Sequence, residues 1–159
     1  MKGDPQVLDA LNRALTVELT AINQYFCQAK MCQNWGFMKL YEKHYHESMG
    51  EMKHAEKLIE RILFLEGVPN LQDLHKLLIG ESVQEALGCD LKLEMAAHPV
   101  LKSGIADAEA TGDYVTRELI RRILASEEEH IDWLEIQLEL IGKIGIENYQ
   151  QSQLGEDED

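Results

Sequence analysis

Two short segments, Glu51-Met52-Lys53-His54 and Glu127-Glu128-Glu129-His130, carry the most information in this 159-residue chain. They are its only two Glu-x-x-His sequences, and a glutamate stands 33 residues before each of them: Glu18 before the first and Glu94 before the second. Each of these residues in the first half recurs 76 positions later in the second half. The sequence therefore contains four carboxylates and two imidazoles in an internally repeated pattern.

Helical geometry predicts that these six side chains converge. Positions i and i+3 of a helix share one face, so each Glu-x-x-His presents an oxygen and a nitrogen to the same point. Glu18 falls in phase with Leu11 and Leu15, and Glu94 falls in phase with Leu87. Leucines at this spacing mark the buried face of a helix. We therefore expect all six polar groups to point into the interior of a helical bundle.

Four buried carboxylates need positive charge beside them. Without it they would repel one another, and some would remain protonated. Two divalent cations balance four glutamates when both histidines are neutral, and this donor set suits iron, manganese or zinc. A single Glu-x-x-His is usually an exposed glutamate beside a core histidine, but the repeated set favours a two-metal site, with iron as the metal if the site is redox-active. The predicted catalytic and metal-binding residues are Glu18, Glu51, His54, Glu94, Glu127 and His130.

The hydrophobic periodicity and the turn residues predict four long helices and a short fifth. Asp4 is expected to cap the first helix, with Pro5 at its first position. The expected elements are a helix from Pro5 to a turn at Asn34-Trp35-Gly36, one from there to about Glu66, one from about Ser82 to Thr111-Gly112, one capped by Asp113 and ending at Lys143 or Gly145, and one over 147–153. Pro99 lies inside the third helix and should produce a kink or a local bulge.

Residues 67–80 form the one long connection without periodicity. At about 3.3 Å per extended residue it can travel roughly 45 Å, the length of a 30-residue helix. The second and third helices can therefore be parallel, joined by a crossover. Di-iron and di-manganese bundles are known to combine a Glu from each of two helices with a Glu-x-x-His from each of the other two. The sequence matches that known arrangement.

The composition limits the classes of protein to which the chain can belong. Its length fits one domain, and 45% apolar residues suffice for one core. A net charge of −14 disfavours nucleic acid and anionic membranes as partners. No signal-like or membrane-spanning apolar run is found, so we expect a cytoplasmic protein. Cys27, Cys32 and Cys89 form no Cys-x-x-Cys pair and are expected to be buried free thiols.

With these features established, the whole chain resembles the bacterioferritins, the haem-containing branch of the ferritins. The segments that carry the resemblance are Met1-Lys2-Gly3-Asp4, Glu18 with Ala21-Ile22-Asn23-Gln24-Tyr25-Phe26, Tyr45-His46-Glu47-Ser48, Glu51-Met52-Lys53-His54-Ala55, Arg61-Ile62-Leu63-Phe64-Leu65-Glu66-Gly67, Pro69-Asn70-Leu71-Gln72 and His130-Ile131-Asp132-Trp133-Leu134-Glu135. The resemblance implies an all-α fold: a ferritin-like four-helix bundle with a long crossover and a short fifth C-terminal helix. The bundle would occupy residues 1–154, followed by an acidic, disordered tail over 155–159.

The resemblance also implies a function. Family members of this kind form a homo-oligomeric shell of 24 subunits, built from two-fold dimers, that stores and detoxifies iron as a ferric mineral. Each subunit would be a ferroxidase that oxidises Fe(II) with O₂ or H₂O₂ at a centre of two iron ions. Glu51 and Glu127 would bridge the irons. The remaining ligands would be Glu18 with His54 at one iron and Glu94 with His130 at the other. The oxidant, mixing with a second subunit type and a ferredoxin-type reductant stay open.

The same resemblance makes Met52 the axial ligand of a haem b shared between two subunits. Met52 follows Glu51 by about 100° around the helix, which directs it to the flank of the bundle when Glu51 points inward. Thioether ligation favours ferrous haem. On residue type alone, a methionine at such an edge is more often packing material. The residues expected to form the walls of the haem pocket are Ile22, Asn23, Phe26 and Tyr45.

Three further residues have more than one interpretation. Tyr25 lies two turns after Glu18 on the same face, where it either hydrogen-bonds a ligand or donates an electron, or is a core tyrosine. Trp133 is more readily explained by packing than by a redox role. The family often has an acidic residue where this chain has Gly50, so His46 lacks a carboxylate partner and an inner-surface iron site is doubtful.

Two other functions are compatible with the sequence. One is a di-iron oxidoreductase or peroxidase of the same bundle type that stores nothing, although the Cys-x-x-Cys electron-transfer module that would favour it is absent. The other is a non-catalytic bundle whose polar residues form a hydrogen-bonded network. A saturable uptake of iron separates the last from the first two, and the presence of a closed shell separates storage from oxidoreduction.

Overall fold

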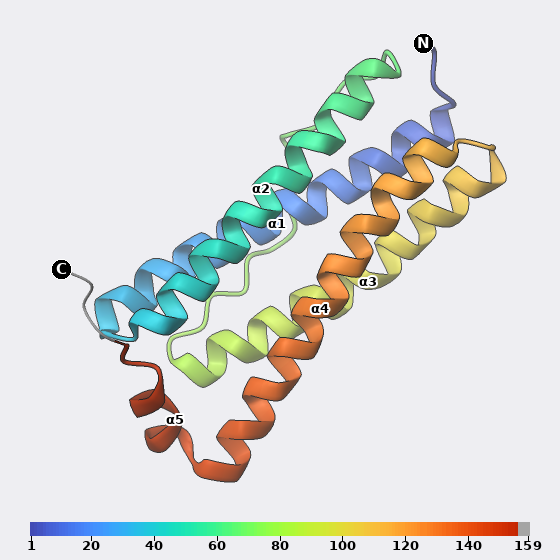
Figure 1. Ribbon diagram of the computed structural model, residues 1–159. Helices are drawn as coiled ribbons and strands as arrows, with labels where there is room; N and C mark the ends of the chain where they lie inside the picture. The colour runs from blue at the N-terminus through green and yellow to red at the C-terminus, as the bar shows by residue number, and fades with distance from the viewer. Residues whose placement is uncertain (156–159) are drawn as a thin grey trace.

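The computed structural model describes residues 1–155, which form five helices and no strand (Figure 1). The helices are α1 (Pro5–Trp35), α2 (Met38–Phe64), α3 (Val83–Ala110), α4 (Tyr114–Ile144) and α5 (Ile146–Ser152). Four long helices and a short fifth confirm the predicted all-α, ferritin-like architecture. The acidic tail expected over 155–159 lies outside the described residues, apart from Gly155.

Side chains identified in the sequence cap three of the helices. The Asp4 carboxylate accepts a hydrogen bond from the backbone N–H of Gln6 at 2.8 Å, and Asp113 accepts one from Thr116 at 3.0 Å. Ser82 caps α3 in the same way. These side chains satisfy backbone donors that have no partner inside the helix, which is why the helices begin where they do.

The end of α2 differs slightly from the prediction. The helix stops at Phe64 rather than near Glu66, because Glu66 adopts a left-handed conformation with φ of 61°. The backbone N–H of Gly67 then donates to the carbonyl of Ile62 at 2.9 Å, which closes the last turn. The short fifth helix also begins one residue earlier than expected, at Ile146.

The helices form two antiparallel pairs, α1 with α2 and α3 with α4, joined by a connection that runs the length of the bundle (Figure 1). Because of this crossover α2 and α3 run parallel, as the sequence predicted. Polar side chains of α1 hold the connection in place. Asn12, Thr20 and Gln24 accept hydrogen bonds from the backbone N–H groups of Asn70, His75 and Leu78 at 2.8–3.0 Å.

The apolar core is divided into two large clusters. One contains Leu11, Leu15, Leu58, Ile62, Leu101, Ile120 and Ile123; the other contains Leu40, Leu87, Leu134, Ile141 and Tyr149. The predicted metal ligands lie between them. The middle of the bundle is therefore a polar layer, and the apolar clusters on either side of it stabilise the fold by burying hydrophobic surface.

Two expectations about single residues need correction or comment. Of the three free cysteines only Cys32 is buried, whereas Cys27 is exposed and Cys89 is half-buried. α3 remains α-helical on both sides of Pro99 and through it. Across residues 1–155, no helix has the length and apolar character needed to cross a bilayer.

Candidate metal centre

All six predicted ligands meet in the middle of the bundle, and each long helix contributes to them. α1 supplies Glu18, α2 supplies Glu51 and His54, α3 supplies Glu94, and α4 supplies Glu127 and His130. Five of them are at most 2% exposed. The side chain of His54 is 23% exposed, so the prediction that all six point inward needs this qualification.

One group of donors gathers around His54. Its Nδ1 lies 3.4 Å from Oε2 of Glu18, 3.4 Å from Oε2 of Glu51 and 3.7 Å from Oε1 of Glu127. One atom from each of these four residues lies within 4.8 Å of the others. Three carboxylate oxygens and one imidazole nitrogen at this spacing form a suitable donor set for one divalent cation.

A second group gathers around His130. Its Nδ1 lies 3.2 Å from Oε1 of Glu94, and Glu127 completes a set of three within 4.8 Å. Glu127 therefore belongs to both groups, the position required of a carboxylate that bridges two metals. Glu51 belongs only to the first group in this structure, so its bridging role stays a prediction.

The centre has more acceptors than donors. Oε1 of Glu18, Oε2 of Glu94, Oε1 of Glu127 and Nε2 of His130 are buried without a hydrogen-bond partner among the described residues. Burial raises the pKa of Glu127 well above its ordinary value, and the nearby Glu51 carboxylate raises it further. Buried acceptors without donors are costly unless a cation is present. The donor set and its unsatisfied atoms thus fit two bound metal ions.

Two aromatic residues support the His130 side. The Tyr25 hydroxyl donates a hydrogen bond to Oε1 of Glu94, and its ring packs edge-on against His130 with centroids 5.1 Å apart. Of the interpretations left open for Tyr25, the hydrogen bond to a predicted ligand is observed. Trp133 stacks on His130 at 6.0 Å, which establishes packing for this residue.

The sequence did not single out several polar neighbours. Glu47 places Oε2 at 3.9 Å from Nδ1 of His130 and pairs with Lys43 at 2.9 Å. Asp90 and His44 are almost completely buried on the side of the second apolar cluster. A signal existed for Asp90, since it lies four residues before Glu94 and so on the same helix face. Nothing in the sequence indicated that His44 would be buried beside it.

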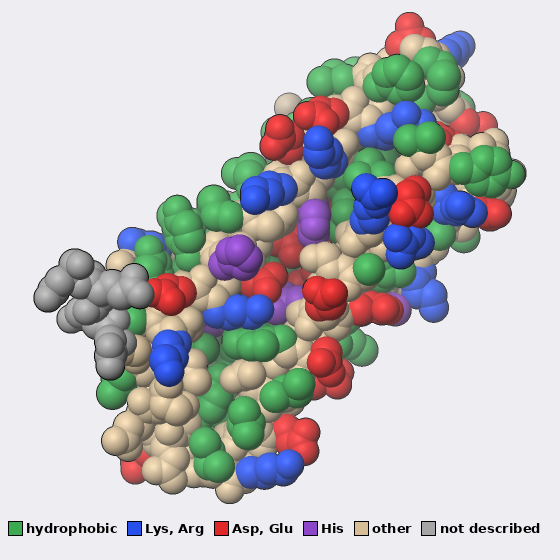
Figure 2. All heavy atoms as spheres, in the orientation of Figure 1, with side chains coloured by type: hydrophobic (Ala, Val, Ile, Leu, Met, Phe, Trp, Pro, Cys, Tyr) green, Lys and Arg blue, Asp and Glu red, His purple; other side chains and the backbone are tan. Residues whose placement is uncertain are grey.

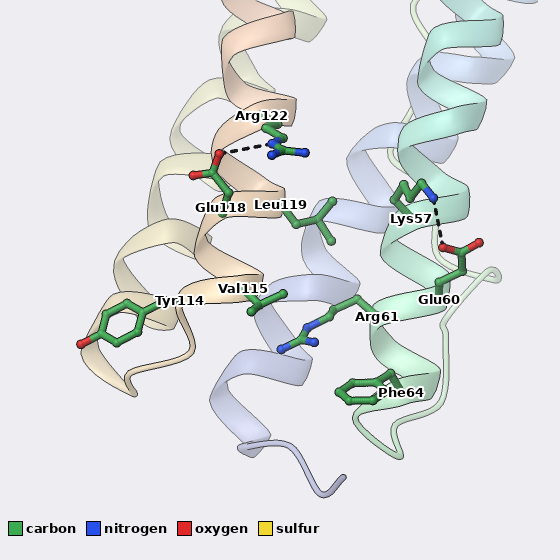
Figure 3. A pocket seen from close by; sticks show the side chains of 9 residues that line it. All are labelled: Lys57, Glu60, Arg61, Phe64, Tyr114, Val115, Glu118, Leu119 and Arg122. Atoms are coloured by element: carbon green, nitrogen blue, oxygen red, sulfur yellow. Dashed lines mark hydrogen bonds and ion pairs between the residues drawn. The ribbon is translucent and has the colours of Figure 1, made fainter.

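The molecular surface shows how the centre relates to solvent. Figure 2 shows acidic and histidine side chains gathered between α2 and α4, with Lys and Arg side chains farther along the same face. A separate groove of about 550 Å³ lies between α2 and α4 (Figure 3), and none of the six predicted ligands lines it. The residues that line it are Lys57, Glu60, Arg61, Phe64, Tyr114, Val115, Glu118, Leu119 and Arg122.

The flank predicted for haem carries an open apolar patch. Met52 is 49% exposed, Phe26 44% and Tyr45 39%, and the rings of Phe26 and Tyr45 lie 6.2 Å apart across the α1–α2 pair. The hydroxyl of Ser48 donates to the carbonyl of Ile22 at 3.0 Å, which places Ile22 beside the stretch of α2 between Tyr45 and Met52. A thioether on a half-exposed apolar face fits a flat hydrophobic group held between two subunits.

His46 and Gly50 lie four residues apart on α2, so the two positions share one face of the helix. His46 is exposed, and across residues 1–155 no ion pair involves it. A Cβ added to Gly50 would meet no atom within 4 Å. The space beside position 50 would therefore admit a side chain, although this chain has a glycine there.

The bundle and its carboxylate–imidazole cluster define a ferritin-like protein with a candidate metal centre. The profile of the Ferritin-like domain family matches residues 8–144. The chain is 48% identical to the bacterioferritin of Brucella melitensis over 151 residues, which cover 95% of this chain and 94% of that protein. It is 49% identical to the bacterioferritin of Mycolicibacterium paratuberculosis over 149 residues (94% of each chain) and 47% identical to the bacterial ferritin of Pseudomonas aeruginosa over 157 residues (97% and 100%). The chain belongs to the bacterioferritin family.

Proposed function

We propose that this chain is an iron-storage subunit that oxidises Fe(II) at the two-metal centre. The observation that carries the proposal is the pair of donor groups that share Glu127 in the buried middle of the bundle. Storage is favoured over the non-storing oxidoreductase because the relatives that match over nearly the whole chain are named bacterioferritin or bacterial ferritin. A purely structural polar network is disfavoured, since it would leave four buried polar atoms without hydrogen-bond partners among the described residues.

The ligands divide the work as follows. Glu18 and His54 hold one Fe(II), Glu94 and His130 hold the other, and Glu51 and Glu127 bridge the two. Burial raises the pKa of Glu127, and bound metal ions would favour its carboxylate form, in which it is a full ligand. Two Fe(II) ions lose one electron each. The two electrons and two protons reduce O₂ to H₂O₂, or H₂O₂ to two water molecules.

Haem b is the second group that the family implies, and the exposed Met52 is the residue that would hold it. Its sulfur would bind the haem iron, and Phe26 and Tyr45 would line the pocket. Bound haem supplies one-electron transfer. The symmetric arrangement needs one Met52 from each of two copies, so the patch around Met52 would be covered in a two-fold dimer.

The assembled form would be a shell of 24 identical subunits in the cytoplasm, with residues 1–154 as the structural unit. Two exposed apolar regions support an oligomer: the Met52 patch and the groove of Figure 3, where Phe64, Tyr114 and Val115 are 53–63% exposed. Apolar surface of this kind is usually covered by a partner.

An anaerobic Fe(II) titration of the metal-free protein tests this function. We expect binding to saturate at about two Fe(II) per chain. Oxidation should be rapid when O₂ is added, and an iron core should grow within a protein shell that keeps its number of subunits. Glu127→Gln should remove most of the tight binding, whereas Glu128→Gln, on an exposed neighbour, should not. Equal binding by both variants, or particles too small to enclose a cavity, would contradict the proposal.

A further inference from the structure

A second buried polar cluster lies beside the metal centre, on the side of α5. It consists of Gln24 and Gln28 on α1, His44 on α2 and Asp90 on α3, and each is at most 1% exposed. We refer to these four residues as the Asp90 cluster. Asp90 precedes Glu94 by four residues, about 6 Å along the axis of α3. The Asp90 cluster is therefore one helical turn from the two-metal centre and shares none of its six ligands.

Part of the cluster is well satisfied. Nε2 of Gln24 donates to Oδ1 of Asp90 at 2.9 Å, while Oε1 of Gln24 accepts from the N–H of Leu78 at 3.0 Å. Nε2 of Gln28 donates to the carbonyl of Ala86 at 3.4 Å. These bonds hold one edge of the Asp90 carboxylate against α1 and tie it to the crossover.

Three polar atoms in the same cluster have no hydrogen-bond partner within residues 1–155: Oδ2 of Asp90, Nδ1 of His44 and Oε1 of Gln28. Burial raises the pKa of Asp90 to about 7 and lowers that of His44 to about 3, so the imidazole is neutral near pH 7. The nearby Lys43 is already paired with Glu47 at 2.9 Å. A buried carboxyl group and a neutral imidazole therefore face each other, each with a polar atom that has no hydrogen-bond partner among the described residues.

Their separation matches metal ligation better than direct contact. Nδ1 of His44 and Oδ2 of Asp90 are 3.7 Å apart, which is too long for a hydrogen bond. The same spacing separates Nδ1 of His54 from Oε1 of Glu127 in the metal centre. An ion about 2.1 Å from each atom would subtend an angle of about 120° between them, within the range of protein metal sites.

We propose that the Asp90 cluster is a third metal site, which binds one divalent transition-metal ion through Oδ2 of Asp90 and Nδ1 of His44, with Oε1 of Gln28 as a further oxygen donor. One nitrogen and two oxygens suit Fe²⁺ or Zn²⁺. Gln24 orients the carboxylate as an outer-sphere partner. A bound ion would join α1, α2 and α3 at one point. The site is independent of the two-metal centre and does not require that centre to oxidise iron.

The test is an anomalous-scattering experiment on crystals of the assembled protein soaked anaerobically in Zn²⁺, and separately in Fe²⁺, with data on both sides of each absorption edge. We expect two peaks among the six ligands and one between His44 and Asp90. Two outcomes would overturn this inference alone. In one, the two-metal centre gives peaks and the Asp90 cluster gives none. In the other, the Asp90 cluster holds density without anomalous signal, which is water. Absence of the first two peaks would instead count against the proposed function.

Variants of the cluster give a second readout. Asp90→Asn keeps an oxygen to accept from Gln24 and removes a buried charge, so the bundle should still fold. Its crystals should lose the third peak and keep the other two, and His44→Phe should do the same. His75→Gln, on an exposed histidine of the crossover, is the matched control and should retain all three peaks. A third peak of undiminished height in Asp90→Asn would refute the assignment.

Discussion

Tyr25 shows how one side chain serves the metal centre without being a ligand. Its hydroxyl donates to Glu94, and its ring supports the edge of His130. Both contacts act on the same half of the centre. Residues that orient ligands in this way commonly affect metal affinity more than they affect folding.

Replacing Tyr25 with Phe removes the hydroxyl and keeps the ring. We expect metal affinity on the His130 side to fall by roughly tenfold or more, with a loss of stability of about 1 kcal/mol. Anaerobic Co²⁺ titration followed by visible absorption measures the first effect. Tyr149→Phe is the control, because the Tyr149 hydroxyl donates to Gln137 at 2.7 Å, away from the six ligands. Equal affinities in the two variants would rule out an orienting role.

At the scale of the element, Gly50 lowers the stability of α2. A glycine inside a helix has more freedom to lose on folding than an alanine. The space beside Gly50 is open, whereas a Cβ on Gly104 in α3 would lie 3.2 Å from Cδ1 of Ile120. The two glycines therefore differ, since an added Cβ meets a packed side chain only at Gly104.

Gly50→Ala should raise the free energy of unfolding by about 0.5–1 kcal/mol. Gly104→Ala is the matched variant, and we expect it to be neutral or destabilising because Ile120 must shift to make room. Urea denaturation at one fixed protein concentration compares them, since assembly contributes to apparent stability. A larger gain in Gly104→Ala than in Gly50→Ala would show that the packing has been misjudged.

The start of α4 depends on Asp113. Its carboxylate caps the helix at Thr116 and pairs with Arg61 of α2 at 2.9 Å, so it joins the two halves of the bundle. Burial by itself would raise the pKa of Asp113, but the hydrogen bonds from Thr116 and the charge of Arg61 together lower it. The stabilisation is therefore complete above the unfolded-state pKa, about 3.9, and is lost as the pH falls through the lower folded-state value.

Asp113→Ala should cost about 1–2 kcal/mol near pH 7, and its difference from the wild type should shrink below about pH 4. Chemical denaturation across this pH range measures both. Glu118→Ala removes a carboxylate that, among residues 1–155, pairs only with the exposed Arg121 and Arg122, so it should have little effect. A cost for Asp113→Ala that is independent of pH would show that the carboxylate charge contributes nothing.

At the scale of the whole molecule, the predicted metal ligands and the Met52 patch lie in different parts of the bundle. The metal ligands occupy the middle, the two apolar clusters occupy the ends, and the Met52 patch lies on the outer flank of α1 and α2. Met52 and Glu51 are neighbours in sequence but face different directions, one half-exposed and the other buried. The helix geometry thus allows a haem site and a metal site to coexist without sharing side chains.

Met52→Leu should abolish haem absorbance and leave both particle mass and the initial rate of Fe(II) oxidation nearly unchanged. Leucine keeps the volume and apolar character of methionine but has no sulfur to ligate iron. Visible spectra, mass measurement and oxidation kinetics on one preparation are sufficient. Loss of Fe(II) oxidation together with haem would show that the two sites are not separate.

The sequence alone predicted the six side chains that meet in the middle of the bundle and the kind of fold that brings them together. Both follow from spacing within single helices: Glu-x-x-His at one turn, leucines at three and four, and capping residues such as Asp4 and Asp113. The long interval over 67–80 also permitted the crossover, because a connection of that length can return along the bundle. These features depend on local geometry, which is the same in any helix.

The tertiary structure decided which atoms meet. It brought Glu127 into both donor groups, left His54 partly exposed, and ended α2 at Phe64 through the left-handed Glu66. It also buried His44 against Asp90, a contact between residues 46 positions apart on different helices. Such pairings depend on the register and rotation of one helix against another, which many side chains set together and no short segment encodes.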